Sequence, residues 1–233
     1  MGLLLGVHTL NSDDTAVSVT TAPITTQVSG SGLVLTIDFF TTQTFVSVSD
    51  SKGNAWVQIG TEVIAGATVA MRRYYCANAG GGSGHTFTAT VTGIVPIGIA
   101  VTEILTTNGQ GVLLDQQASA VDPTSPYDSP GITTTLASEF LLAPITSHGG
   151  GATYNNVPGN SFTLVDQETN GNRFFPMGVA YRLVSSISTY SATWTISPTP
   201  TNGLVCIQSF SEAPPILLAF DEGGTSFQIV QAP

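Results

Sequence analysis

The chain has 233 residues and a mass of 24.1 kDa, which is enough for one ample hydrophobic core or two small ones. Only 9% of its residues are charged and 42% are hydrophobic, which excludes charge-rich intrinsic disorder. Five basic against fifteen acidic residues give a formal net charge of −10, so the chain has no basic stripe that could neutralise nucleic acid. We therefore expect no nucleic-acid partner.

The first residues, MGLLLGVHTL, are apolar but lack the basic region and the cleavage site of a signal peptide. Gly6 stands where an N-myristoylation signal needs Ser or Thr, so Gly2 is not expected to carry a lipid. Apolar runs are broken by Pro or Gly well before the ~18 residues of a membrane span, and no Asn-x-Ser/Thr sequon occurs. We expect no membrane partner, synthesis in a bacterial cytoplasm, and an N-terminal arm over residues 1–14.

Period-two alternation of apolar and polar residues predicts antiparallel strands along the chain. The clearest runs are LVLTIDFF at 33–40, FVSVSD at 45–50, HTFTATVT at 85–92 and SATWTIS at 191–197. In the first run, Thr36 and Asp38 fall on the face opposite Leu33 and Leu35. Thr and Ser on water-facing positions suit a soluble β protein with few charges.

Turn signals separate these runs, and helix signals are scarce. Turns are predicted at residues 50–54, 78–85, 107–111, 169–172 and 198–203, and long loops at 122–131 and 147–161. The predicted fold is all-β: an antiparallel, jelly-roll-like β-sandwich forming a single large domain with long loops over residues 15–212. Residues 213–233 are expected to be a C-terminal tail.

Two stretches of the chain resemble each other. VSVSDSKGNAW and YYCANAGGGSGHTFTATVTG are echoed by TLVDQETNGNRF and AYRLVSSISTYSATWTIS. Either the domain contains a duplication, or two hairpin pairs follow the same turn chemistry; the second interpretation is favoured, because short β patterns recur by chance.

Both cysteines, Cys76 in YYCAN and Cys206 in LVCIQSF, lie in apolar, strand-like surroundings. Buried free thiols are favoured over a disulfide, although the sequence alone leaves the pairing open. Trp56, Trp194, Phe174 and Phe175 are expected in the core, since large aromatic residues dominate sandwich interiors.

No set of residues has the spacing of a known catalytic or metal motif. GGGSGH, residues 80–85, misses the nucleophile-elbow pattern because His85 replaces its last glycine, and a hairpin turn is expected there. The three histidines are single, without chelating partners, and Asp50 and Asp166 suit capped turns better than calcium loops. We expect no enzyme activity, no catalytic residue, no metal and no cofactor.

The remaining candidates are contacts with a ligand or a partner. Asp115, Asp122 and Asp128 could supply a carboxylate pair for glycoside hydrolysis, but solvated turn residues are favoured. Asp122, Tyr127 and Asp128 are the candidate residues for binding a sugar or partner. Arg72 and Arg73 either bind an acidic neighbour or form a buried internal ion pair, and the sequence favours neither.

The run VSVSDSKGNAWVQIG, followed by RRYYCANAGGGSGHTFTATVTG, IAVTEIL and YDSPGITTT, resembles a family of β-sandwich modules found in bacteriophage virion proteins and bacterial cell-surface proteins. The positions that carry the resemblance extend over about residues 15–211 and hold Asp50, Gly53, Asn54, Trp56, Tyr74, Tyr75, Ala77, His85 and Glu103. The resemblance implies a jelly-roll-like fold without a catalytic set.

Together, these features predict a non-enzymatic virion structural protein, namely a capsid decoration protein or an accessory fibre or tail module. Such a protein would assemble with copies of itself and with other virion proteins through its tails and sheet surfaces. The alternative is a carbohydrate-binding or adhesin module that contacts a host glycan through the loops at 122–131 and 147–161.

Overall fold

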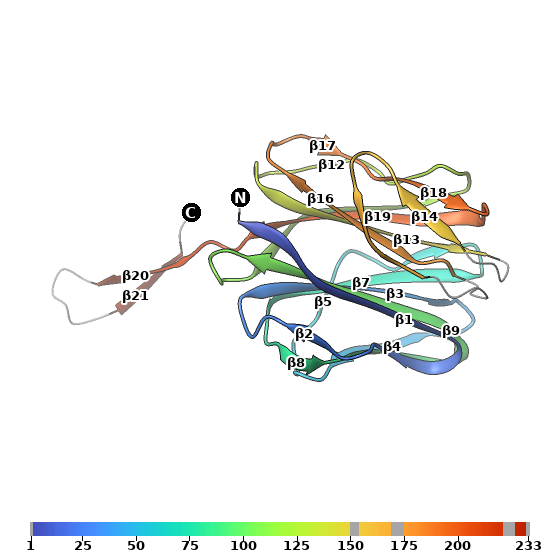
Figure 1. Cartoon of the computed structure of the whole chain (residues 1–233), viewed down its shortest axis with the longest axis horizontal. Coiled ribbons are helices and arrows are strands. Elements are labelled where there is room, and N and C mark those ends of the chain that lie inside the picture. Colours follow the sequence, from blue (N-terminus) through green and yellow to red (C-terminus); the bar gives the residue numbers. More distant parts are fainter. Residues whose placement is uncertain (1, 150–153, 169–174, 221–226, 232–233) are drawn as a thin grey trace.

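The chain is all-β in the computed structural model, which describes residues 2–149, 154–168, 175–220 and 227–231. Strands make up 67% of it, the sheets are antiparallel, and the described residues contain no helix. The predicted antiparallel β-sandwich class is confirmed. Figure 1 shows two stacked β-sheet lobes and a separate C-terminal hairpin.

The N-terminal half consists of the strands up to residue 106, built around a seven-stranded sheet in the order β1-β9-β3-β7-β5. The strands are β1 (Leu3–Thr20), β2 (Ile24–Thr26), β3 (Ser31–Phe40), β4 (Phe45–Asp50), β5 (Val57–Gln58), β6 (Val63–Ala65), β7 (Val69–Ala79), β8 (Gly82–His85) and β9 (Phe87–Thr106). β4 also pairs with β9, β6 with β7, and β2 with β8.

Two long strands, β1 and β9, fold this sheet over itself. Their pairing shifts register between Asp13 and Ala16, close to Pro96 in β9. Beyond this point, Val19 and Phe87 pack in one core with Leu35 of β3. The N-terminal half is therefore a sandwich closed by the bend of its own longest strands.

The C-terminal half repeats this plan from residue 112 to residue 212. Its strands are β10 (Val112–Asp122), β11 (Tyr127–Asp128), β12 (Ile132–Thr133), β13 (Glu139–His148), β14 (Asn155–Pro158), β15 (Thr163–Gln167), β16 (Gly178–Val184), β17 (Thr189–Tyr190), β18 (Thr193–Ser197) and β19 (Thr201–Glu212). One sheet runs β10-β19-β13-β16-β15; β11-β18-β14 and β12-β17 lie against it over a core that includes Trp194.

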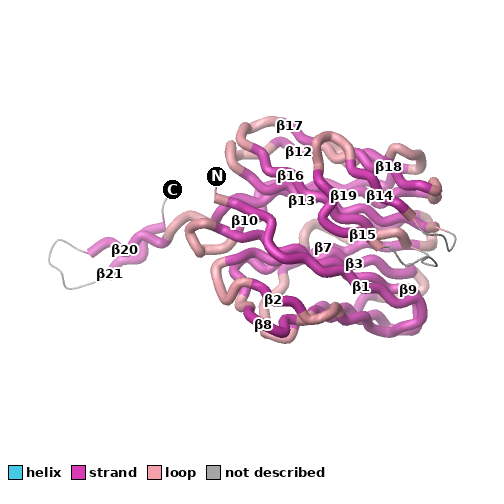
Figure 2. The backbone as a smooth tube through the Cα atoms, in the orientation of Figure 1, coloured by secondary structure: helices cyan, strands magenta, loops and turns pink. Residues whose placement is uncertain are grey.

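The two halves pack sheet against sheet (Figure 2). Val34 and Ile104 from the N-terminal half share a buried cluster with Phe140, Val179 and Phe210 from the C-terminal half. β1 lies near β15, and in the same way β10 lies near β6. This reciprocal contact indicates an approximate two-fold relation between the halves.

The pairing registers match as well as the strand orders. Ile24 of β2 lies opposite His85 of β8, just as Ile132 of β12 lies opposite Tyr190 of β17. In the central sheets, the pair Leu33 and Glu103 corresponds to Leu141 and Ser209. The fold is thus a structural repeat rather than the one large sandwich predicted.

This repeat explains part of the sequence echo. YYCANAGGGSGHTFTATVTG and AYRLVSSISTYSATWTIS do fall on corresponding strands, β7 to β9 and β16 to β18. VSVSD and TLVDQ do not correspond, since the first forms β4 on β9 and the second forms β15 on β16.

Stacking of the halves also overturns two expectations. Thr36 and Asp38 are buried, because the second face of β3 meets the other half instead of water. Residues 3–14, expected as an arm, belong to β1 and pair with β9, since Leu3 is part of the core shared by the halves.

Several of the predicted turns and loops contain strands and are therefore shorter than predicted. β8 lies within the turn at 78–85, β11 divides the loop at 122–131, β13 ends at His148, and β14 (Asn155–Pro158) lies inside the loop at 147–161. β19 already begins at Thr201, inside the turn predicted at 198–203. The turn predicted at 169–172 lies outside the described residues.

Candidate functional site

Asp50 organises the turn after β4. Its carboxylate accepts hydrogen bonds from the Lys52 amide at 2.8 Å, the Asn54 amide at 3.2 Å and the Trp56 indole at 2.8 Å. This is the capped-turn role that the sequence predicted for Asp50. The carboxylate is fully buried, so these bonds replace the water that it loses.

His85 joins Asp50 to Thr26 in a relay of hydroxyl, imidazole and carboxylate. Its Nε2 lies 3.0 Å from the Asp50 carboxylate, and its Nδ1 lies 2.8 Å from the Thr26 hydroxyl. Because the Asp50 carboxylate only accepts, the imidazole donates to it through Nε2, and in a neutral imidazole Nδ1 then accepts from the Thr26 hydroxyl, which also accepts from the Gly82 amide.

A hydroxyl, an imidazole and a carboxylate joined in this order are the groups that activate a hydroxyl nucleophile in a catalytic triad. Here, however, Thr26 and His85 are both buried, so a substrate has no access to the hydroxyl. The relay instead ties β2, β4 and β8 together at one end of the N-terminal half.

A carboxyl pair lies in the C-terminal half, at the start of β13. Burial raises the pKa of Glu139, and the charge on Asp115 adds to the rise. Burial acts in the same direction on Asp115, but hydrogen bonds from Thr135 and Glu139 outweigh it and lower the pKa of Asp115. Thr135 donates to Asp115 from its amide at 2.8 Å and from its hydroxyl at 2.6 Å.

Two carboxyls with pKa values pushed apart are typical of acid–base chemistry. Glu139, however, is only 1% exposed, so a substrate cannot reach it. Its carboxyl also contacts that of Asp115 directly, whereas the two carboxyls of a glycosidase lie about 5 Å or more apart, on either side of the bond that is cleaved. The sequence pointed to Asp115 but grouped it with Asp122 and Asp128 instead of Glu139.

The predicted ligand-binding residues form a structural turn. Asp122 accepts from the amides of Thr124 and Asp128, and Asp128 accepts from the Thr193 hydroxyl at 2.6 Å. Tyr127 is fully buried, and its hydroxyl donates to the Pro200 carbonyl at 2.6 Å. The prediction that Tyr127 contacts a sugar or partner is wrong, because its ring is part of the core.

The two consecutive arginines point to opposite sides of β7. Arg72 pairs with Glu62 at 2.5 Å and lies over the Phe45 ring. Arg73 is buried between the halves and donates to Gln208 at 2.9 Å and Gln117 at 3.2 Å. Arg73 is thus internal, but glutamines replace the predicted ion-pair partner, whereas Arg72 forms an ion pair within the chain at a partly exposed position.

The cysteines and aromatic residues predicted to be buried lie in or against the core wherever the structure describes them. Cys76 and Cys206 are free and buried, as favoured, and burial raises the pKa of the Cys206 thiol to about 11. Trp194 and Phe175 are fully buried and Trp56 packs against the core, while Phe174 lies outside the described residues.

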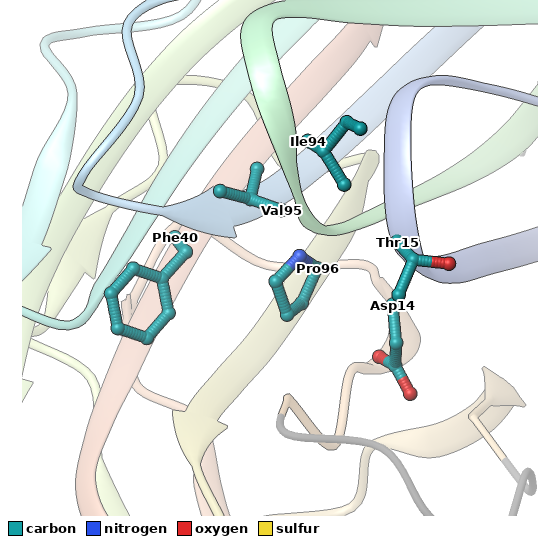
Figure 3. Close-up of a pocket in the computed structure, with 6 residues that line it drawn as sticks. All are labelled: Asp14, Thr15, Phe40, Ile94, Val95 and Pro96. Carbon is teal, nitrogen blue, oxygen red and sulfur yellow. The ribbon is translucent and has the colours of Figure 1, made fainter.

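Each half has a hollow at the bend between its layers. In the N-terminal half it measures about 340 Å³; Figure 3 shows Phe40 from the end of β3, Ile94 to Pro96 from β9, and Asp14 and Thr15 from β1. The hollow in the C-terminal half lies at the corresponding ends of β13 and β19, where His148, Tyr154 and Pro200 line it. The first is mainly apolar, and its two polar lining residues, Asp14 and Thr15, do not by themselves specify a ligand.

A third hollow, of about 230 Å³, is polar. Arg182 and Tyr190 line it, with Asn160 and Ser161 from the end of the predicted long loop. The Arg182 guanidinium covers the Tyr190 ring and donates to the Asn160 carbonyl at 2.8 Å. It is a shallow polar cleft whose aromatic ring is already covered.

The chain ends in a hairpin, β20 (Ile216–Phe220) and β21 (Phe227–Gln231), where a tail was predicted. Figures 1 and 2 show it extending away from both halves. Eight of its ten strand residues, five in β20 and three in β21, are hydrophobic. Two apolar runs separated by Gly223 and Gly224 were the available sequence signal.

The exit of this hairpin is fixed. The Glu212 carboxylate accepts from the Thr107 hydroxyl at 2.9 Å and the Asn108 amide at 3.0 Å, and the Ala213 amide donates to Gly111. The Thr107 amide in turn donates to the Gly2 carbonyl at 2.8 Å. The hairpin therefore leaves the body beside the start of β1.

No family model matches the chain, and no curated protein matches it. Among the described residues, no helix is long and apolar enough to cross a membrane. Within the same residues, no three or more His, Cys, Asp and Glu side chains gather as a metal site would require.

Proposed function

We propose that the chain is a non-enzymatic structural protein of a bacteriophage virion, either a capsid decoration protein or an accessory fibre or tail module. The observation that carries this proposal is the hairpin β20–β21. An isolated two-stranded hairpin is marginally stable in water, so an apolar one that leaves its own body needs a neighbour to cover it.

The strand order supports the same proposal. We assign each half as a jelly roll, because its first strand lies beside its last in one sheet and the second sheet closes over the core. Jelly rolls occur in viral capsid and lectin domains. Thr-rich, weakly charged surfaces with an acidic balance favour protein neighbours over nucleic acid.

Purified particles of a phage whose genome carries this gene provide the test. We expect the chain to sediment with intact particles through a density gradient and to be found in them by mass spectrometry. A chain that stays in the soluble lysate while other virion proteins sediment would overturn the proposal. A cytoplasmic host enzyme serves as the control for carry-over.

The polar cleft beside Arg182 supports the alternative, a glycan-binding module. Its amide, hydroxyl and guanidinium groups suit sugar hydroxyls, although Arg182 covers the Tyr190 ring. In a glycan-array screen, binding that disappears in Arg182→Ala but persists in Arg72→Ala would favour this alternative. No binding above background would exclude it for the sugars tested.

A further inference from the structure

We propose that the hairpin β20–β21 of one copy adds to the free edge of β1 in a second copy of the same chain. This inference rests on the proposed structural function and names its partner. Four features support it: the composition of the hairpin, its exit, the edge of β1, and the distribution of charge.

The hairpin is built mainly from apolar residues. Its backbone register sets Leu218 opposite Ile229, Phe220 opposite Phe227 and Leu217 opposite Val230. Cross-strand pairs of this kind stabilise a sheet that has a covered face. None of the ten strand residues is charged, so the hairpin lacks the usual protection of an exposed edge.

The acceptor is the first part of β1. In the described sheets β1 pairs only with β9, so the strand has no partner on its other side. Leu4 is 50% exposed and Val7 is 37% exposed along this stretch. An apolar edge strand offers unpaired backbone groups to a strand from another chain.

The distribution of charge along the chain favours a second copy of the chain as the partner that receives the hairpin. The chain carries a formal net charge of −10, so two copies repel each other except where their contact surfaces are neutral. Residues 1–12 contain no Asp, Glu, Lys or Arg, and the same holds for the strands β20 and β21. Neither segment therefore brings a carboxylate of its own to the contact, and the Asp166 carboxylate beside the acceptor strand is already paired with His8 at 3.1 Å.

The geometry permits a reciprocal exchange. The hairpin exit at Glu212 and Ala213 is joined through Thr107 to Gly2, at the beginning of the acceptor strand. Donor and acceptor thus lie side by side at one end of the molecule, where Figure 1 also places the N-terminus. Two copies related by a two-fold axis there would each give and receive one hairpin.

Light scattering of the purified chain over a wide concentration range tests the exchange. The full chain should associate with itself, while a chain ending at Ala213 should stay monomeric. The double variant Leu4→Lys/Val7→Lys should weaken association about tenfold or more, because two charges would then face the incoming strand. Ile187→Lys, at a residue 61% exposed in the C-terminal half, is the matched control and should associate normally.

A cross-linking experiment identifies the acceptor directly and does not depend on how well the lysine variant folds. A photoreactive residue at position 7 of the chain ending at Ala213 should capture residues 216–231 of an added full-length chain. Capture of another segment, or association unaffected by the lysines, would overturn the β1 acceptor and leave the virion proposal intact. A full chain that is monomeric at every concentration would overturn exchange between copies, and its presence in particles would then assign the hairpin to another virion protein.

Discussion

The two halves share one strand plan but stabilise it with different side chains. Where Leu33 faces Glu103 in the N-terminal half, Leu141 faces Ser209 in the C-terminal half. The N-terminal half uses the buried relay around His85, whereas Tyr190 occupies the corresponding position. The comparison teaches that strand order and register are common to both halves, while the polar chemistry at corresponding positions differs.

The halves also close their sandwiches differently. β1 and β9 run through the bend without a break, even at Pro96, whereas the C-terminal half divides the same paths into β10 with β11 and β18 with β19. Segments containing two prolines each, at 123–126 and 198–200, make those breaks. Proline has no backbone N–H to donate, so it favours a break in the hydrogen bonding between two strands. Pro96 shows that a strand can nevertheless continue through a proline.

The largest predicted effect concerns the core of the C-terminal half. Trp194→Ala should lower the free energy of unfolding by about 3–5 kcal/mol, because Trp194 is fully buried in that core. Calorimetry would show whether both halves lose stability together. Since Phe140, Phe210 and Val34 share one cluster between the halves, we expect a single transition at lower temperature. Two separate transitions would contradict this coupling.

Removing the buried carboxylate of the N-terminal half should be nearly as costly. Asp50→Ala leaves His85, Trp56 and the turn amides without their acceptor, and should cost about 3 kcal/mol in urea unfolding. Asp122→Ala, in an exposed turn of the other half, is the control and should cost less than about 1 kcal/mol. Equal losses would contradict a special role for the relay.

Amide substitutions should affect the two buried glutamates in opposite directions. Glu103 accepts from the Gln27 amide, the Ser31 hydroxyl and the Val7 amide, so Glu103→Gln should cost about 1–3 kcal/mol near pH 7. Glu139→Gln should instead raise the free energy of unfolding there, because burial penalises the charged form of Glu139.

The pH dependence gives a further test of Glu139. Its folded pKa is raised, so its contribution to stability is complete below the unfolded pKa and is lost as pH rises through the folded pKa. Stability curves of the parent chain and Glu139→Gln should therefore converge in acid and separate toward neutral pH. A constant difference at all pH values would contradict the raised pKa.

The smallest effect is expected from the thiols, one in each half. Burial raises the pKa of Cys76 and of Cys206, so neither should react with a thiol reagent in the native chain. Near the urea midpoint, single variants Cys76→Ala and Cys206→Ala should label at equal rates if the halves open together. Faster labelling of one thiol would show which half opens first.

Much of the fold follows from local patterns in the chain. Alternating runs located β3, β4, β9 and β18, and the turn at Asp50 followed from its Asp, Gly and Asn residues. The N-terminal arm and the water-facing side of β3 were misassigned for one reason. Each assignment depends on which other strand or sheet packs against the segment. The alternation of apolar and polar residues shows only that a strand has two different faces.

An all-β chain of antiparallel strands, two buried thiols and capped turns could be predicted, because these features depend on residue spacing and local hydrogen bonding. The burial of Asp38 and Arg73, the contact between Asp115 and Glu139, and the departure of β20–β21 from the body could be read from the fold alone. These outcomes arise from stacking two sandwiches and from contacts between residues far apart in the chain, and no local pattern encodes such contacts.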